Sequence, residues 1–250
     1  MQFYKRFYHL RITTPNYCII GEFGIKPMEF HCYKSALNYY LKLNNENDKK
    51  LITRIFKLIN SNLNLKSFRN TWCDRILKLI RKTQLLQFKD CDSFDKISKN
   101  VINTVLIEYF RRTWIDSAKN SNKGLRYLEL CRFQCEVKQY LCLNGDKIKI
   151  NNILQLRTGN HTLAAEIGTY QNRSTHNNFI CKFCDKNEIE DIFHFISICP
   201  RYRIERLALI PFLVDCERSD FYETMNVLKA GQTCAIDEFI DKAMHIRNSR

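Results

Sequence analysis

The sequence predicts a mainly α-helical protein, folded as an irregular helical bundle. Only 7 Gly and 4 Pro occur in 250 residues, too few for the turns of an all-β fold, and 45% of the residues are apolar. In several segments the apolar residues recur at i, i+4, i+7 and i+8, the spacing of one buried helix face. The length allows one large or two modest domains with their own hydrophobic cores.

Residues 47–60 form the first strongly periodic segment. Its apolar stripe, which we expect to be buried, consists of Leu51, Ile55, Leu58 and Ile59.

Further helices are expected along the rest of the chain. They cover residues 72–83, 94–117 with Ser93 as the cap, 124–143, 203–213, 219–230 and 235–247. The turn sequence NGDK at 144–147 marks a candidate boundary. We therefore expect a basic helical region at 1–146, a small module at 147–215 and C-terminal helices at 216–250.

The net charge of +14 is unevenly distributed. Residues 1–150 carry 28 Lys and Arg against 13 Asp and Glu, a net +15, whereas residues 151–250 carry 12 against 13, a net −1. A cationic excess in one part of a chain is typical of contact with a polyanion, although acidic protein surfaces attract it too. We expect RNA or DNA as the partner.

The cysteine usage and the N-terminus indicate the compartment. Lys, Arg or His interrupts every apolar run of the first 16 residues, and no stretch approaches the roughly 20 apolar residues of a membrane span. We expect an intracellular protein, nuclear or cytoplasmic, that is neither secreted nor bound to membranes. In a reducing compartment, clustered Cys and His favour metal binding over disulfides.

One segment carries the spacing of a metal site, Cys181-x2-Cys184-x9-His194-x4-Cys199. Three thiolates and an imidazole are the ligands of a tetrahedral Cys3His zinc site, which leaves no open position for water. The pattern predicts one structural Zn²⁺ per chain. An ordinary buried helix with incidental thiols, or a thioredoxin-like redox pair, is the alternative.

The same segment predicts a short helix. Asn187 is the expected N-cap, with Glu190 reaching back to it as in a capping box, and Ile189, Ile192, Phe193 and Ile196 are the expected core stripe. His161 is interpreted as a packing or hydrogen-bonding residue, because four ligands already fill the site.

These residues resemble a known family. The stretch LRTGNHTLAAEIGTYQNRSTHNNFICKFCDKNEIEDIFHFISICPRY is similar to the C-terminal, post-polymerase region of LINE-type (non-LTR) retrotransposon reverse transcriptases, which contains a CCHC reverse-transcriptase zinc-binding module. TTPNYCIIGEFGIKP resembles the segment after the polymerase thumb, and LRYLELCRF resembles the spacer. The sequence contains no Asp-Asp pair, so the polymerase box of the family is absent, and the palm, the fingers and any endonuclease would lie upstream of Met1.

The resemblance implies a non-catalytic, zinc-containing nucleic-acid-binding tail. It would act on RNA or DNA, alongside other parts of a retrotransposon protein or complex, and would have no small-molecule substrate. The basic residues that we expect to contact phosphates lie on the predicted helices and around the zinc module. They are Arg75, Lys78, Arg81, Lys82, Arg111, Arg112, Arg157, Arg173, Lys182, Arg201, Arg203 and Arg206.

Two alternatives stay open. The first is a zinc-stabilised protein-interaction module, in which the acidic stretch Glu188–Asp191 and the apolar face of IFHFISI meet another protein. The second is a relic fragment of a mobile element without activity of its own. An enzyme is the least favoured reading, since no Ser/His/Asp order, P-loop or nucleotide fingerprint occurs.

Overall fold

The computed structural model describes residues 1–47, 49–62, 71–87, 97–142, 147–170, 179–209, 211, 217–226 and 230–249. Within these residues the fold is mainly helical and contains no β-strand, only two isolated β-bridges. The mainly α class predicted from the sequence is confirmed. Among the described helices, none combines the length and the apolar character that crossing a membrane would need.

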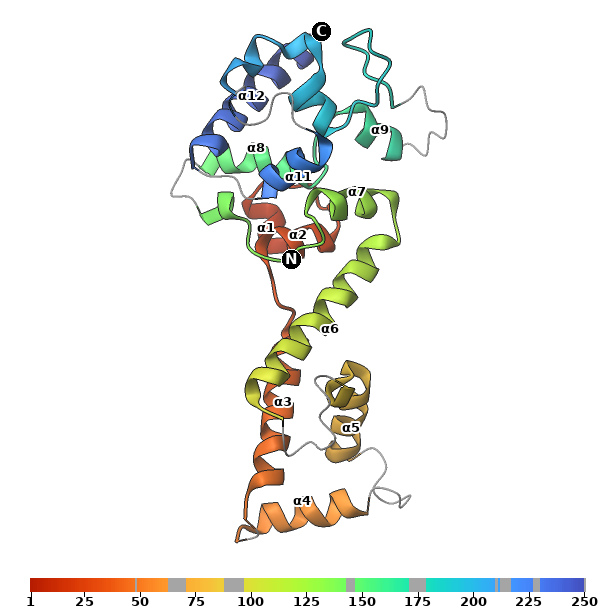
Figure 1. Cartoon of the computed structure of the whole chain (residues 1–250), viewed down its shortest axis with the longest axis vertical. Coiled ribbons are helices and arrows are strands. Elements are labelled where there is room, and N and C mark those ends of the chain that lie inside the picture. The colour runs from red at the N-terminus through yellow and green to blue at the C-terminus, as the bar shows by residue number, and fades with distance from the viewer. Residues whose placement is uncertain are drawn as a thin grey trace. The chain divides into compact units, whose positions relative to one another are not determined.

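The chain forms two compact units (Figure 1). Unit 1 comprises Met1–Ile25 and Trp114–Arg250, and unit 2 comprises Lys26–Thr113. The N-terminal 25 residues thus fold with the C-terminal half of the chain. The boundaries expected at 146 and 215 fall on residues outside the described part and stay predictions.

Unit 2 is a helical cluster around one apolar core. Its elements are α3 (Met28–Asn45), α4 (Leu51–Ser61), α5 (Trp72–Thr83), the short 3₁₀-helix η2 (Leu85–Gln87) and the N-terminal part of α6 (Lys99–Lys119). The helices α3, α4 and α5 contact one another in pairs. The core between the helices includes Leu37, Phe56, Ile76, Leu85 and Leu106.

The helix α5 begins and ends where the sequence predicts, at residues 72 and 83. The Thr71 hydroxyl accepts a hydrogen bond from the Asp74 backbone N–H at 3.4 Å, which satisfies one free donor of the first turn. Gln84 ends the helix in the left-handed conformation, with φ of 57°.

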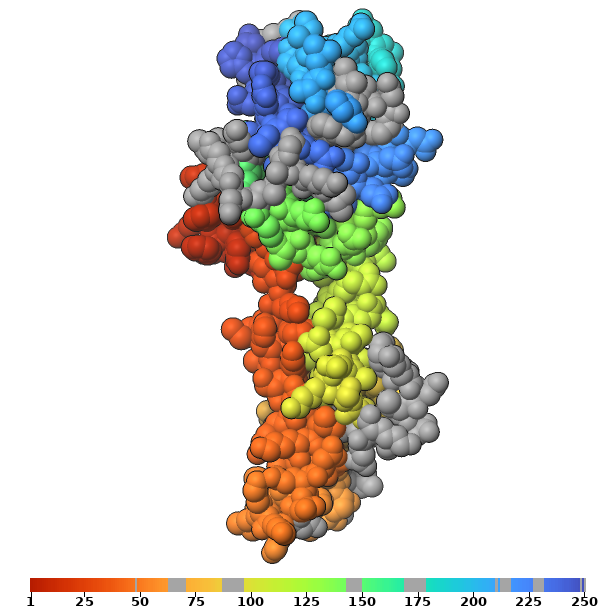
Figure 2. Space-filling view, turned by 60° about the vertical axis from the view of Figure 1, so that its left-hand side comes forward, coloured from red at the N-terminus to blue at the C-terminus, as the bar shows by residue number. Residues whose placement is uncertain are grey.

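The orientation predicted for α4 is wrong for three of the four stripe residues. Leu51, Ile55 and Leu58 are 72%, 43% and 60% exposed, whereas Ile59 is partly buried against the core, and α4 lies at the surface (orange, Figure 2). The buried residues of α4 are Thr53 and Phe56, on the other side of the helix. The Phe56 ring packs against the Tyr40 ring at 5.1 Å, and one large aromatic contact thereby decides which side turns inward.

Unit 1 is built from α1 (Gln2–Phe7), α2 (Asn16–Phe23), the end of α6, and the helices that follow. These are α7 (Asn122–Leu130), α8 (Lys147–Arg157), α9 (Ala164–Tyr170), α11 (Arg218–Asn226) and α12 (Ala230–Asn248), with short turns η4 (Gln139–Cys142), η7 (Pro200–Tyr202) and η8 (Glu205–Leu209). The helix α12 packs on α8 and η8, while α7 contacts α2, α9 and α11.

Two of the helices predicted for this unit are shorter than expected. The helix expected at 124–143 ends at Leu130, because Arg132 and Phe133 adopt left-handed conformations with φ of 54° and 56°. Helical structure returns only at Gln139. The segment expected to be helical at 203–213 is a 3₁₀-helix at Glu205–Leu209, and most residues after it lie outside the described part.

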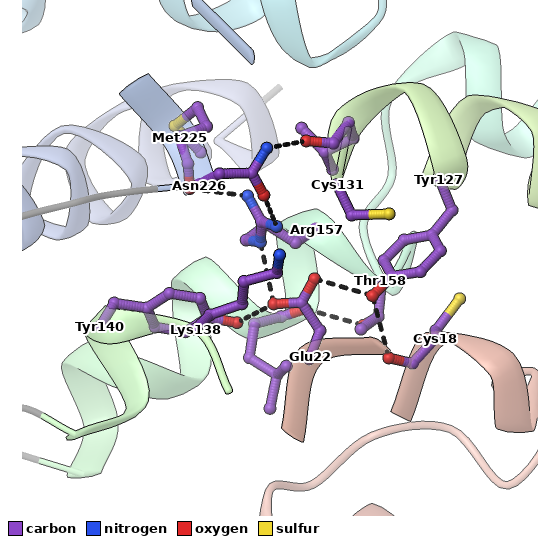
Figure 3. A network of polar contacts seen from close by, with 12 residues as sticks. Cys18, Glu22, Tyr127, Cys131, Lys138, Tyr140, Arg157, Thr158, Met225 and Asn226 are labelled. Atoms are coloured by element: carbon purple, nitrogen blue, oxygen red, sulfur yellow. Dashed lines mark hydrogen bonds and ion pairs between the residues drawn. The ribbon is translucent and has the colours of Figure 1, made fainter. Parts of the chain in front are cut away.

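The N-terminal segment is fixed in unit 1 by a buried polar network around Glu22 (Figure 3). Arg157 Nε donates to Glu22 Oε2 at 2.9 Å, and both side chains are fully buried. The hydroxyls of Tyr127 and Tyr140 donate to the same carboxylate at 3.0 and 2.6 Å. Burial alone would raise the pKa of Glu22, but the charge and hydrogen bond of Arg157 hold it below its ordinary value.

Two backbone features hold the α2 end of this network. The carbonyl of Glu22 accepts from the Lys138 N–H at 3.0 Å, next to an antiparallel bridge between Phe23 and Val137. Gly24 ends α2 with φ of 55°, and a Cβ at this position would lie 2.6 Å from the Val137 nitrogen. Only glycine fits both the conformation and the close approach.

Candidate metal centre

The four residues singled out by spacing converge in space. Cys181, Cys184, His194 and Cys199 each offer a ligand atom, and these atoms all lie within 4.8 Å of one another. The Cys181 and Cys199 sulfurs are 3.9 Å apart, and Cys184 Sγ lies 3.4 Å from His194 Nε2. This cluster, the Cys/His module of residues 181–199, can hold a metal ion.

Short backbone elements position the first two thiols. An antiparallel bridge joins Ile180 and Ile189, and the Cys181 N–H donates to the Glu188 carbonyl at 2.9 Å. Each of the three cysteines receives a hydrogen bond from the backbone N–H two residues further on, at Phe183, Lys186 and Arg201. Such donors favour the thiolate form, which is the form that binds metals.

Glu188 orients the histidine. Its Oε2 lies 3.0 Å from His194 Nδ1, so the carboxylate accepts a hydrogen bond from this nitrogen and leaves Nε2 facing the thiols. A carboxylate behind a ligating imidazole fixes the ring and raises its basicity. His194 is buried while Glu188 is exposed, and the partner therefore approaches from the surface.

The thiols show why the cluster favours a cation. The hydrogen bond to Cys199, together with burial, raises the pKa of the Cys181 thiol to about 12, while the same hydrogen bond lowers the pKa of Cys199. Two thiolates 3.9 Å apart repel each other, so without a cation the ionisation of both thiols is disfavoured. A bound metal ion offsets this repulsion and allows both to ionise.

The helix of the module begins later than predicted. Asn187 is not its cap but a left-handed turn residue with φ of 52°. The cap is Asp191, whose Oδ1 accepts from the His194 N–H at 2.8 Å, and a π-helical turn then covers His194–Ile198. Ile189 takes part in the bridge and is exposed, whereas Phe193 and Ile196 are buried as expected.

Glu190, expected in a capping box, instead joins three parts of unit 1. Its Oε2 accepts from the Ala164 N–H at the start of α9 at 2.7 Å, and both oxygens pair with Arg247 of α12. Its Oε1 lies 3.9 Å from the Cys181 sulfur, and the Arg247 guanidinium stacks on Phe183 at 4.5 Å. These contacts connect the Cys/His module to α9 and α12.

Comparison of the chain with models of protein families, with curated proteins and with solved structures finds no match. The site is therefore interpreted from its own geometry.

Two of the basic residues expected to bind phosphates are structural, and those expectations are wrong. Arg157 is buried in the Glu22 network. Arg206 is also buried and donates to the backbone carbonyls of Phe195, Ile196 and Cys199, at the end of the π-helical turn and just after it. Neither guanidinium is placed to bind a phosphate, because both are buried and donate to groups inside the fold.

The other basic residues on which the structure bears lie at or near the surface. Arg75, Lys78, Arg81, Lys82, Arg112, Lys182, Arg201 and Arg203 are exposed, and Arg111 is half-buried. Arg173 lies outside the described residues.

Within unit 2 the end of α5 approaches α6. The Lys82 ammonium lies 5.6 Å from the centre of the Tyr109 ring, and Arg112 donates to Gln84 Oε1 at 3.4 Å. Glu108 accepts from both Arg111 and Arg112, which holds its pKa at about 2. The structure thus brings Lys82, at the end of α5, close to the part of α6 that carries Arg111 and Arg112.

Part of the surface expected for a protein-interaction module is buried, while Glu188 and Ile189 are exposed. Phe195 and Ile196, from the apolar face of IFHFISI, are fully buried in the core of unit 1. Glu190 is buried as well, and Asp191 pairs with Arg218. That apolar face packs inside the protein rather than presenting itself to a partner.

The spacing in the sequence identified the four residues that cluster, but not the residues that support them. Glu188 six residues before His194, and Asp191 three residues before it, carry signals that could have been used: a carboxylate near a ligand histidine and an Asp at an N-cap spacing. Glu22 gives no such signal, because its partner Arg157 is 135 residues away in the sequence.

Proposed function

We propose that this chain is a non-catalytic, zinc-containing, nucleic-acid-binding part of a protein resembling the LINE-type reverse transcriptases. In this proposal the cations of unit 2 bind the phosphates of the nucleic acid, and the Cys/His module stabilises unit 1. RNA and DNA are both candidate partners, since phosphates are common to them.

The observation that carries the proposal is the concentration of charge in unit 2. Residues 26–113 hold 18 Lys and Arg against 8 Asp and Glu, a net +10 of the chain's +14. On α5 the cations Arg75, Lys78, Arg81 and Lys82 are exposed, while the opposite face is buried. An exposed basic helix face suits a phosphate backbone.

Zinc is the metal that suits the donor set best. Zn–S bonds of about 2.3 Å and Zn–N bonds of about 2.0–2.1 Å in a tetrahedron put two sulfurs about 3.8 Å apart, and a sulfur and a nitrogen about 3.5 Å apart. Here the Cys181 and Cys199 sulfurs are 3.9 Å apart, Cys184 Sγ lies 3.4 Å from His194 Nε2, and all four ligand atoms lie within 4.8 Å of one another. Four protein ligands leave no open position, which makes the proposed role structural.

The metal is tested by elemental analysis of the purified protein, alongside Cys184→Ser and the matched control Cys142→Ser, whose thiol is exposed in the same unit. We expect one zinc per chain in the wild type and the control. The Cys184→Ser variant loses the zinc and melts at a lower temperature, as followed by far-UV circular dichroism. Equal zinc content and equal melting in all three proteins would contradict a zinc site.

Nucleic-acid binding is tested by fluorescence anisotropy with labelled RNA and DNA oligonucleotides across a salt series. Arg75→Glu, Arg81→Glu and Lys82→Glu are combined in one variant. We expect its affinity to fall at low salt, and the slope of log K against log salt to become shallower by about 2–3, because up to three phosphate contacts are lost.

The control variant carries the same change of charge on unit 1, at the exposed residues Lys119, Arg132 and Lys242. A smaller loss is expected in this control. Equal losses of affinity in the two variants would show that unit 2 has no special role in binding. A wild-type protein that binds neither RNA nor DNA at low salt, with its metal site intact, would overturn the proposed function.

A further inference from the structure

The two tryptophans of the chain have opposite environments. Trp114 in unit 1 is 4% exposed, and its Nε1 donates to the Tyr17 carbonyl at 2.8 Å. Trp72 in unit 2 is 39% exposed at the first residue of α5. Tryptophan is among the most buried residue types on average, so an exposed indole on a basic helix calls for an explanation.

Trp72 is paired with a second exposed ring. Tyr39 of α3 is 46% exposed, and its ring centre lies 5.6 Å from that of Trp72, with an angle of 65° between the ring planes. Behind them, the buried rings of Tyr40 and Phe56 lie 6.0 and 6.5 Å from Trp72. Trp72 therefore has a packed side that holds it in place and an accessible side.

Each exposed ring has a cation one helical turn further on. Lys42 follows Tyr39 by three residues on α3, and Arg75 follows Trp72 by three residues on α5, and both cations are exposed. Residues at i and i+3 share a helix face. The nearby carboxylates Glu46 and Asp74 are each paired with a lysine four residues on, which reduces their repulsion of an anion.

We propose that Tyr39 and Trp72 form a stacking platform for the unpaired bases of a single-stranded nucleic acid, with Lys42 and Arg75 placed for its phosphates. Aromatic rings interleaved with cations are the combination that binds single strands without regard to sequence, because every base has a π-face. In a duplex those faces are covered by neighbouring base pairs. This inference rests on the proposed function, and it adds that unit 2 prefers single strands.

The test uses the whole protein with an unstructured oligothymidylate, an oligouridylate and a blunt DNA duplex of equal length. Trp114 is buried and gives a constant background, so quenching of tryptophan fluorescence reports on Trp72. We expect quenching by both single strands and none by the duplex, and tighter binding of the single strands by anisotropy.

Two variants locate the effect. Trp72→Leu and Tyr39→Leu should each weaken single-strand binding by about 5- to 150-fold and leave duplex binding unchanged. Tyr39→Leu serves as the second variant because its ring is the more exposed, so that a folding defect in Trp72→Leu does not decide the result. Phe3→Leu, which removes an aromatic ring 70% exposed in unit 1, is the matched control and should change nothing.

The outcomes separate the two proposals. Suppose that charge reversal in α5 abolishes binding, but that the wild type binds single strands and duplex with equal affinity and Tyr39→Leu changes neither affinity. This result would overturn the stacking platform and leave the proposed function intact. Absence of binding to all three probes at low salt would overturn both.

Discussion

A buried ion pair is central to the contacts that attach the first 25 residues to the rest of unit 1. Glu22 and Arg157 are both fully buried, and Arg157 also donates to the Met225 carbonyl at 2.8 Å and to Asn226 Oδ1 at 3.0 Å. One guanidinium thereby connects α2, α8 and α11. Such a group resembles a phosphate-binding arginine in sequence, and only the fold reveals that its five donors face inward.

Removing the Arg157 charge alone should lower the free energy of unfolding more than removing both charges of the pair. Arg157→Met leaves the Glu22 carboxylate buried without its main counter-charge, and we expect a loss of about 3–5 kcal/mol in the free energy of unfolding. Adding Glu22→Gln should recover part of it, because it removes the stranded charge while the amide oxygen accepts from the Tyr140 hydroxyl and the amide NH2 donates to the Tyr127 hydroxyl, which can itself donate to the Cys18 carbonyl. Urea unfolding of both proteins measures the difference, and a double variant no more stable than the single one would contradict the role of the stranded charge.

His161 gives the fold a defined sensitivity to acid. Its Nδ1 accepts from the Leu163 N–H at 3.2 Å, the hydrogen-bonding role expected from the sequence. Burial, and then the charges of Lys123 and Arg126, lower the pKa of His161 from 6.5 to about 3. Between pH 6.5 and 3 the unfolded chain binds a proton here and the folded chain does not, so stability is lost as the pH falls, by about 1.4 kcal/mol per unit.

His161→Asn keeps a hydrogen-bond acceptor but removes the titration. We expect the drop in unfolding free energy between pH 7.5 and pH 5 to be about 2 kcal/mol smaller in this variant than in the wild type. Urea unfolding at several pH values measures it. The acid sensitivity of the metal ligands is the same in both proteins, and parallel stability curves would therefore contradict the assignment.

At the scale of single helices, periodicity predicted where helices form better than which side they bury. The bounds of α5 match the expected range because its apolar residues, its Thr71 cap and its basic outer face all agree. In α4 two apolar faces compete, and the more continuous one faces solvent. The sequence of α4 alone does not contain the Tyr40 and Trp72 rings against which Phe56 packs.

The two faces of α4 should therefore respond differently to substitution. Leu58→Gln replaces a side chain that is 60% exposed by another good helix former, and we expect a change under about 0.5 kcal/mol. Phe56→Ala leaves a cavity in the core and should lower the free energy of unfolding by about 3–5 kcal/mol. Chemical unfolding of the two variants provides the comparison, and equal costs would show that the stripe is buried after all.

In the Cys/His module, too, the local sequence predicted the N-terminal end of the helix incorrectly. The four ligands could be identified because metal chemistry restricts both residue type and spacing. The capping box expected at Asn187 does not form, because two longer-range contacts use the same segment. These are the bridge between Ile180 and Ile189 and the ion pair of Glu190 with Arg247, 57 residues away. A local motif loses where tertiary contacts satisfy the same groups better.

Over the whole molecule, the Cys/His module belongs to unit 1 and most of the net positive charge to unit 2. Metal removal should therefore act on one unit more than the other. In hydrogen exchange followed by mass spectrometry, we expect a chelator to increase exchange in the module, α9 and the end of α12, which Glu190 and Arg247 connect. Exchange in α3 and α5 should stay unchanged, and a uniform increase over both units would contradict their independence.

The division of the chain also sets an order of events during synthesis. Unit 2 is continuous in sequence, whereas unit 1 is completed by residues 114–250, so the inserted unit leaves the ribosome before the surrounding one can close. At about 5–20 residues per second, the last 225 residues take on the order of 10–45 s to be made. During that interval Cys18 and Ile19, fully buried in the finished protein, have no core to enter. These two residues therefore stay exposed until the rest of unit 1 has been made.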